Sequence, residues 1–277
     1  EQLLEIVNQR KKVEVNELAS LLEVSKVTIR KDLTELENRG LLQRQHGFAI
    51  INNPNNLNFR LAQNYDIKHK IAEAAATLVQ DNETIMIESG STCALLAEEL
   101  GKSGKHVTII TISFFIANYV RNYDNITVYT LGGQYQSDAQ VVVGPLTKTM
   151  LANFHTEKLF LGIDGFDRNY GFYGNDIMRT DTVHAMADNA DKTYILTDSS
   201  KFELTSTVHQ LPFQQVDTVI TDNQLSKEAH RVLNFQQIKV QTVAIKQIVA
   251  MTEATQTANL LLLPPSTSMR VFRYALP

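Results

Sequence analysis

The sequence predicts an α/β protein in two parts: a small N-terminal region of helices and a longer region built on a mostly parallel sheet. Two observations support this division. The first forty residues repeat apolar side chains at helical spacing and are followed by a short extended stretch. From about residue 59, apolar runs alternate with amphipathic stretches, which is typical of parallel strands joined by helices that cover both faces of a sheet.

Composition indicates a globular protein of ordinary character. The 277 residues exceed the roughly 100–200 of one domain, and 43% of them are hydrophobic. No apolar run approaches the ~18 residues that a membrane span needs, and the single cysteine, Cys93, rules out an internal disulfide framework. We therefore expect a cytoplasmic protein without membrane association. The net charge of −4 does not indicate a nucleic-acid partner, so any affinity for DNA must come from the local placement of cations.

The stretch after Val24 predicts a helix with one buried face and one polar face. Ser25 is a suitable N-cap, and Ile29, Leu33 and Leu36 recur at i, i+4 and i+7. The opposite side carries hydroxyl groups, cations and one small apolar side chain. That mixture suits phosphates, base edges and a thymine methyl group. An ordinary amphipathic surface helix has the same pattern.

The elements around this helix predict a winged helix-turn-helix. One helix precedes residue 13, a second covers residues 17–22, and a short turn leads into the helix that follows Ser25. Residues 41–50 form two extended runs around a turn, which indicates a wing. His46 in that turn is equally compatible with an ordinary surface histidine. The side chains expected to contact DNA are Ser25, Lys26, Val27, Thr28, Arg30, Lys31, Thr34, Arg44 and His46.

The longer region predicts seven strands separated by helices. Strands are expected at residues 84–87, 107–112, 126–131, 158–163, 193–197, 216–221 and 238–243. Helices are expected at residues 67–80, 94–100, 114–121, 146–154, 182–189 and 226–233. Ligands of such sheets bind at the carboxyl ends of the strands, so the residues that directly follow each strand are the candidates for a binding site.

Those residues share a chemistry of hydroxyls, glycines, carboxylates and a lysine. Together they suit a polyhydroxylated, phosphorylated ligand, with small residues at a helix N-terminus for the phosphate. Each loop alone is a weak signal, because ordinary strand-to-helix turns use the same residue types. The expected effector-binding residues are Glu88, Ser89, Gly90, Ser91, Thr92, Thr111, Ser113, Gly132, Gly133, Asp164, Gly165, Asp198 and Lys201.

Catalytic and metal chemistry find little support in the sequence. The seven histidines show no metal-ligand spacing, and Cys93 lacks a His–Asp arrangement, so it is more compatible with a small buried residue than with a nucleophile. We expect no metal, no cofactor and no catalytic residue.

In the predicted winged helix-turn-helix and in the loops that follow the predicted strands, the chain resembles the DeoR family of bacterial transcriptional repressors. In the N-terminal region the resemblance rests on Leu3, Val7 and Ser25-x-x-Thr28-Ile29-Arg30-Lys31-Asp32-Leu33. Further along, the matching segments are Gly90-Ser91-Thr92, Leu131-Gly132-Gly133, Val143-Gly144-Pro145, Phe160-Leu161-Gly162-Ile163-Asp164-Gly165, Gly171-Phe172 and Asp198-Ser199-Ser200-Lys201-Phe202. The resemblance implies a sensor domain with the fold of ribose-5-phosphate isomerase and CoA-transferase-like proteins, and a pocket for a sugar or polyol phosphate.

The sequence departs from the family at several positions. The wing has Gly47-Phe48 where most members have Gly-Gly. Ile112 stands where most have Asn, Tyr173-Gly174 where Thr or Ser is usual, and Val183-His184 where Lys-Arg is usual. Two of these changes border the expected pocket and therefore bear on which effector it takes.

The resemblance implies a repressor of a sugar or polyol catabolic operon. Residues 1–51 would bind a double-stranded DNA operator as part of a homodimer or homotetramer, residues 52–58 would be a linker, residues 59–243 the sensor domain, and residues 244–277 a tail of unknown role. The chain begins inside a helical pattern and without Met, which suggests that residues precede it. The alternative is a sugar-phosphate isomerase-like enzyme with an accessory DNA-binding domain, against which the isomerase's Lys-Gly-Gly-Gly motif is absent.

Overall fold

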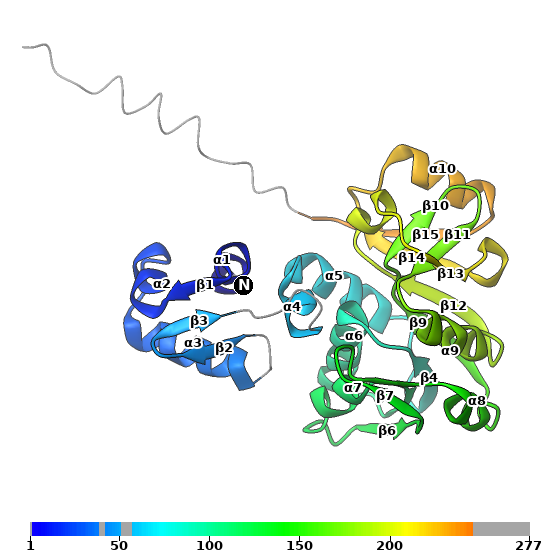
Figure 1. Ribbon diagram of the computed structural model, residues 1–277, viewed down its shortest axis with the longest axis horizontal. Coiled ribbons are helices and arrows are strands. Elements are labelled where there is room, and N and C mark those ends of the chain that lie inside the picture. Colours follow the sequence, from blue (N-terminus) through cyan, green and yellow to red (C-terminus); the bar gives the residue numbers. More distant parts are fainter. Residues whose placement is uncertain (1, 39–41, 51–56, 246–277) are drawn as a thin grey trace, which may run out of the picture. The chain divides into compact units, whose positions relative to one another are not determined.

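The computed structural model in Figure 1 describes residues 2–38, 42–50 and 57–245. Most of the predicted linker and nearly all of the predicted tail lie outside these residues, and helix α4 (Leu57–Ala62) begins within the last part of the predicted linker. No described helix is long and apolar enough to cross a membrane.

The N-terminal region is the predicted winged helix-turn-helix. Its elements are α1 (Gln2–Arg10), β1 (Lys12–Glu14), α2 (Val15–Leu21), α3 (Lys26–Asn38), β2 (Gln43–Gln45) and β3 (Phe48–Ile50). The three short strands form an antiparallel sheet in the order β1-β3-β2. Leu4, Val7, Leu18, Ile29 and Leu33 are buried. The periodic apolar residues of the three helices therefore face one another, as their spacing predicts.

The wing is a tight hairpin. Gln45 pairs with Phe48, so only His46 and Gly47 lie in the turn. Both residues have positive φ, 50° and 83°, which is the backbone of a type I′ turn and matches the twist of two paired strands. The turn therefore sets the register of the wing.

The second region contains a seven-stranded, entirely parallel sheet, so the predicted mostly parallel architecture is confirmed. Its strands are β4 (Glu83–Ile87), β5 (Val107–Thr111), β6 (Ile126–Thr130), β9 (Thr156–Leu161), β12 (Ala190–Leu196), β14 (Thr218–Asp222) and β15 (Lys239–Val243). They lie in the order β15-β14-β12-β9-β4-β5-β6. From β4 the chain builds the sheet in one direction, and from β9 in the other, so the strand order reverses between β4 and β9.

Helices cover both faces of this sheet, as Figure 1 shows. They are α5 (Tyr65–Ala76), α6 (Ser91–Lys102), α7 (Phe114–Tyr119), α8 (Pro145–Leu151), α9 (Ile177–Ala187) and α10 (Lys227–Phe235). Along β4, Ile85 and Ile87 pack on the side of α5, α6 and α7, whereas Met86 packs on the side of α8, α9 and α10. This alternation explains why the second half of β4 is a continuous apolar run.

Several smaller elements surround the carboxyl ends of the strands. Helix α4 precedes α5. Strands β7 (Gln134–Gln136) and β8 (Val141–Val143) form a hairpin, and β10 (Gly165–Asp167), β11 (Gly171–Gly174) and β13 (Val208–Leu211) form a small antiparallel sheet. Two 3-10 turns, η1 (Ser199–Glu203) and η2 (Phe213–Gln215), complete the region. The sequence predicts none of them individually, yet α4, β7, η1 and the residues directly after β11 carry side chains of the site described below.

Candidate functional site

Helix α3 begins as the sequence predicts. The Ser25 hydroxyl accepts a hydrogen bond from the backbone N–H of Thr28 at 3.1 Å, which is the bond of an N-cap. Ile29 and Leu33 are fully buried, whereas Val27 is 75% exposed on the opposite side. The helix therefore presents one polar face to solvent.

The cations on this face are available to a partner. Lys26, Arg30 and Lys31 are exposed, and none of the three forms an ion pair with a described residue. Thr28 lies beside them and is also exposed, with its hydroxyl 2.8 Å from that of Ser25. Free cations next to hydroxyls and one apolar side chain are the groups that contact phosphates and base edges in a major groove.

Arg44 is occupied within the protein. Its Nε donates to Glu37 Oε2 at 2.7 Å, its backbone N–H to Glu37 Oε1 at 2.9 Å, and its Nη1 to the Thr34 hydroxyl at 2.9 Å. The bonds from Arg44 hold the pKa of the Glu37 carboxyl below its usual value. Arg44 therefore ties the wing to α3, whereas His46 at the tip of the wing is exposed.

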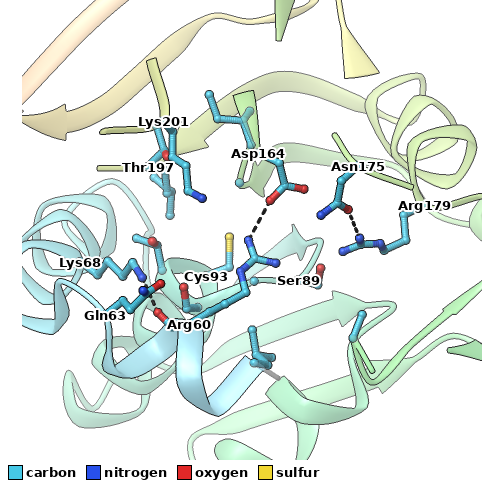
Figure 2. A pocket seen from close by; sticks show the side chains of 18 of the residues that line it. Arg60, Gln63, Lys68, Ser89, Cys93, Asp164, Asn175, Arg179, Thr197 and Lys201 are labelled. Carbon is cyan, nitrogen blue, oxygen red and sulfur yellow. Dashed lines mark hydrogen bonds and ion pairs between the residues drawn. The ribbon is translucent and has the colours of Figure 1, made fainter. Parts of the chain in front are cut away.

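A cavity of about 950 Å³ opens at the carboxyl ends of β4, β9 and β12 (Figure 2). We call it the switch-point cavity, because the strand order reverses between β4 and β9 and parallel sheets open a crevice at such a point. Its wall is formed by the loops after these three strands, by α4 and the start of α5, and by the segments around β7 and the start of α9.

Seven of the residues predicted for the ligand lie together in this wall. They are Ser89, Gly90, Ser91, Thr92, Asp164, Asp198 and Lys201. Gly90 is the N-cap of α6 with φ 91°, a conformation that favours glycine. The first turn of α6 lacks a side-chain cap, so its first backbone N–H groups have no intrahelical partner, and Ser91 and Thr92 of this turn line the cavity. The structure thus brings an open helix N-terminus, a common receptor for anions, to the cavity.

Glu88 lies behind this wall. It borders a smaller adjoining cavity of about 30 Å³ and accepts a hydrogen bond from the Ser89 hydroxyl at 2.7 Å. Burial raises the pKa of its carboxyl, although the Ser89 bond and the charge of Arg179 act in the opposite direction.

The other five predicted residues do not line the switch-point cavity and have structural contacts instead. Thr111 donates from its hydroxyl to the Glu88 carbonyl at 3.0 Å, and Ser113 caps α7. A Cβ on Gly133 would lie 2.0 Å from Thr147 Oγ1, and one on Gly165 would lie 2.8 Å from the Leu204 carbonyl oxygen. The Gly132 carbonyl accepts from Thr147. Strand order is the reason: β5 and β6 lie on the side of β4 away from β9, and Gly165 already belongs to β10.

Three cations of the cavity wall were missed by the sequence analysis. Arg60 comes from α4, Lys68 from α5 and Arg179 from the first turn of α9, and Figure 2 shows their side chains around the cavity. Lys68 carried a detectable signal, because it falls in the buried register of Ile71 and Ala72. Arg60 and Arg179 carried no signal in the sequence, since neither directly follows a strand of the large sheet.

Arg60 and Lys68 connect α4 to the loop after β9 and to α5. Arg60 Nη2 donates to Asp164 Oδ1 at 3.0 Å, and Lys68 Nζ donates to the backbone carbonyl of Arg60. Burial lowers the pKa of Lys68 to about 7, although the charge of Asp198 raises it, and the charges of Arg60 and Lys201 lower it further. Lys68 is therefore a cation only part of the time at neutral pH.

One group of potential metal ligands lies elsewhere. Ligand atoms of His69, Glu73 and Glu99 lie within 4.8 Å of one another, a grouping that histidine spacing did not reveal. His69 Nε2 lies 3.0 Å from Glu99 Oε1, and Lys102 Nζ is 2.8 Å from the same oxygen. These contacts account for the grouping as an ion-pair cluster. Cys93 is buried, and burial raises the pKa of its thiol well above the usual value.

Comparison with known proteins agrees with both halves of the fold. The DeoR-like helix-turn-helix domain matches residues 1–55, and the DeoR C terminal sensor domain matches residues 63–223. The HTH-type transcriptional regulator GolR of Listeria innocua is 31% identical over 83% of this chain and 91% of its own. The L-fucose operon activator of Haemophilus influenzae is 31% identical over 81% and 91%, and the lactose phosphotransferase system repressor of Streptococcus mutans is 31% identical over 86% and 96%.

A winged helix-turn-helix followed by a domain with a polar ligand-sized cavity defines a DNA-binding transcriptional regulator. The chain belongs to the DeoR family. Among solved structures, ribose 5-phosphate isomerase A from Neisseria gonorrhoeae is 23% identical over 50% of this chain and 53% of its own, with a TM-score of 0.37. The relatives named above are regulators, which supports the regulator hypothesis over the isomerase alternative.

Proposed function

We propose that the chain represses a sugar or polyol catabolic operon in the cytoplasm and that a phosphorylated sugar or polyol in the switch-point cavity changes its affinity for the operator. The observation that carries this proposal is the meeting of the open N-terminus of α6 with cationic side chains in one cavity. Backbone N–H groups at a helix start and nearby cations are the usual receptors of a phosphate.

The remaining lining suits the carbon skeleton of such a ligand. Asp198 can accept hydrogen bonds from ligand hydroxyl groups, while Ser91 and Thr92 offer hydroxyl groups of their own. Polar atoms predominate among the lining side chains, so an apolar ligand would leave many of them unpaired. The printed names of relatives, an L-fucose operon activator and a lactose phosphotransferase system repressor, support a role in sugar metabolism.

The DNA-binding half of the proposal rests on the exposed face of α3. Lys26, Arg30 and Lys31 would contact phosphates or bases, and Val27 would contact an apolar base edge. His46 would reach the DNA backbone or minor groove from the wing tip. A single recognition helix contacts too few base pairs for useful specificity, so we expect a homodimer or homotetramer on the operator.

Coupling between the two activities would pass through α4. This helix directly follows residues 51–56, and two interactions with the cavity hold it: the Arg60–Asp164 ion pair and the bond from Lys68 to the Arg60 carbonyl. An anionic ligand competes for both cations. Its binding would therefore release or re-orient α4, and such coupling is typically worth about 1–3 kcal/mol.

Fluorescence anisotropy tests the proposal directly. A labelled fragment from upstream of the gene's own operon is titrated with the protein at fixed salt, and sugar and polyol phosphates are then added to the complex. We expect specific binding that one of these phosphates changes. If the fragment is bound no better than unrelated DNA, the regulator hypothesis fails; if binding is specific but no phosphate alters it, the effector half fails.

Two variants test the DNA-binding half and the effector-binding half of the proposal separately. Arg30→Ala should weaken operator binding about tenfold or more and leave effector affinity unchanged, because Arg30 is not among the residues that line the cavity. Ser91→Glu should abolish the effector response and spare DNA binding, because it places a negative charge where the phosphate binds. Each variant is the control for the other, and loss of both activities in either one would indicate misfolding, which circular dichroism checks.

A further inference from the structure

The charged groups of the switch-point cavity form two clusters that share Arg60 (Figure 2). The charges that act on Lys68 are those of Asp198, Arg60 and Lys201, whereas those that act on Glu88 are Arg179, Asp164 and Arg60. Figure 2 shows the same division: Lys68 and Lys201 lie on one side of the cavity, Arg179 on the other, and Arg60 between them. The cavity therefore has two cationic ends.

The carboxylates of the cavity are largely occupied by the protein itself. Asp164 pairs with Arg60, and Asp198 accepts from the backbone N–H and the hydroxyl of Ser200. Asp176 accepts from the backbone N–H of Arg179 and from Gln136 Nε2, and these bonds keep its pKa low although burial raises it. Asp138, exposed in a turn, is an exception.

The cations of the cavity, in contrast, mostly lack a carboxylate partner among the described residues. Among the described residues, neither Lys201 Nζ nor Arg179 has a carboxylate within ion-pair distance, and Lys68 donates only to a carbonyl. Arg179 Nη2 donates to the Asn175 side chain, but its Nε is buried without a hydrogen-bond partner in the described part of the chain. A buried, unpaired donor on a cation destabilises the protein unless a ligand completes it.

We propose that the effector carries two anionic groups, one at each end of its carbon chain: a phosphate and a second group that is either a carboxylate or another phosphate. The inference rests on the proposed function and narrows its ligand class. Lys68 and Lys201 bind one anion, and Arg179 binds the other, because a planar guanidinium matches the two oxygens of a carboxylate or phosphate. The volume of about 950 Å³ accommodates an extended molecule of this kind.

Isothermal titration calorimetry on the full chain tests this inference. The probes are glucose 6-phosphate and fructose 6-phosphate with one anionic group, 6-phosphogluconate with a phosphate and a carboxylate, and fructose 1,6-bisphosphate with two phosphates. We expect at least one two-anion probe to bind tenfold or more tightly than either monophosphate. Tighter binding of 6-phosphogluconate would identify the second group as a carboxylate, and tighter binding of fructose 1,6-bisphosphate would identify it as a phosphate.

Arg179→Gln supplies the second test. It should lower the affinity for the two-anion probe tenfold or more and so remove the preference for it, while Arg179→Lys should keep part of the preference. Arg168→Gln is the matched control, because Arg168 is an exposed arginine paired with Glu228 outside the cavity. Equal binding of all sugar phosphates, or an unchanged preference in Arg179→Gln, would overturn the inference and leave the proposed function standing. Absence of binding by every phosphate would overturn both.

Discussion

Replacing Lys68 with methionine should make the protein more stable while removing its response to the effector. Methionine keeps the length of the aliphatic chain and deletes the buried amine. Burial lowers the pKa of Lys68 from 10.5 to about 7. At roughly 1.4 kcal/mol per pKa unit, the full shift is worth about 5 kcal/mol, and about 4 kcal/mol of stability is lost at pH 7, where the folded lysine is about half deprotonated.

The net gain is smaller than this figure, because the substitution also removes the hydrogen bond from Lys68 to the Arg60 carbonyl. Such a bond is worth about 1–2 kcal/mol. We therefore expect a gain of about 2–3 kcal/mol, which corresponds to a rise in Tm of about 5–10 °C for a domain of this size. The same amine is one of the cations available to an anionic ligand, so the effector should no longer change operator binding.

The pH dependence gives a second signature. Below about pH 7, Lys68 is protonated in both states and the full penalty is present. Between about 7 and 10.5 the unfolded chain binds more protons than the folded one, so folded stability rises with pH across this window. Lys68→Met should lack that rise. Lys70→Met on the same helix is the control, since Lys70 Nζ donates to the Ala244 carbonyl away from the cavity lining.

Thermal unfolding of the three proteins at pH 6.5, 7.5 and 9, together with anisotropy at pH 7, measures both effects. A Lys68→Met protein that is less stable than the parent at pH 6.5 and 7.5, or that retains the parent's slope with pH, would refute the reasoning. A preserved effector response would remove Lys68 from the ligand site.

Three further predictions follow from contacts in the two regions. Glu37→Ala should weaken specific operator binding about threefold or more, although it removes a negative charge, because Arg44 loses its anchor on α3; tighter binding in an anisotropy titration would show instead that Arg44 contacts DNA. Gly133→Ala should lower stability by about 1–3 kcal/mol, because its Cβ would overlap a threonine hydroxyl, whereas Gly132→Ala should change it far less, since only a flexible methionine sulfur lies nearby. Effector affinity unchanged in both glycine variants would assign these residues to structure alone. Asp164→Asn should shift the operator affinity of the free protein toward its effector-bound value, because it weakens the ion pair that holds α4; calorimetry on the same variant shows whether the effector still binds.

Local chemistry determined much of this protein from the sequence. The 3.6-residue period of Ile29 and Leu33 predicted which side of α3 is buried, and the Ser25 cap predicted where the helix begins. Apolar runs predicted all seven strands of the large sheet. Most residues of the five inner strands are buried and therefore apolar, whereas the edge strands β6 and β15 are only partly buried. The small residues at 89–92 were correctly placed at a helix start, because turn and cap preferences depend on neighbouring residues alone.

Tertiary structure alone decided which loops meet. The loops after β4, β9 and β12 share the switch-point cavity, whereas those after β5 and β6 do not, because strand order reverses between β4 and β9. Strand order is set by pairing between distant segments and leaves no local period in the sequence. The same holds for the ion pair of Arg60 with Asp164, which joins residues 104 positions apart, and for Arg179, which only the packing of α9 brings to the cavity.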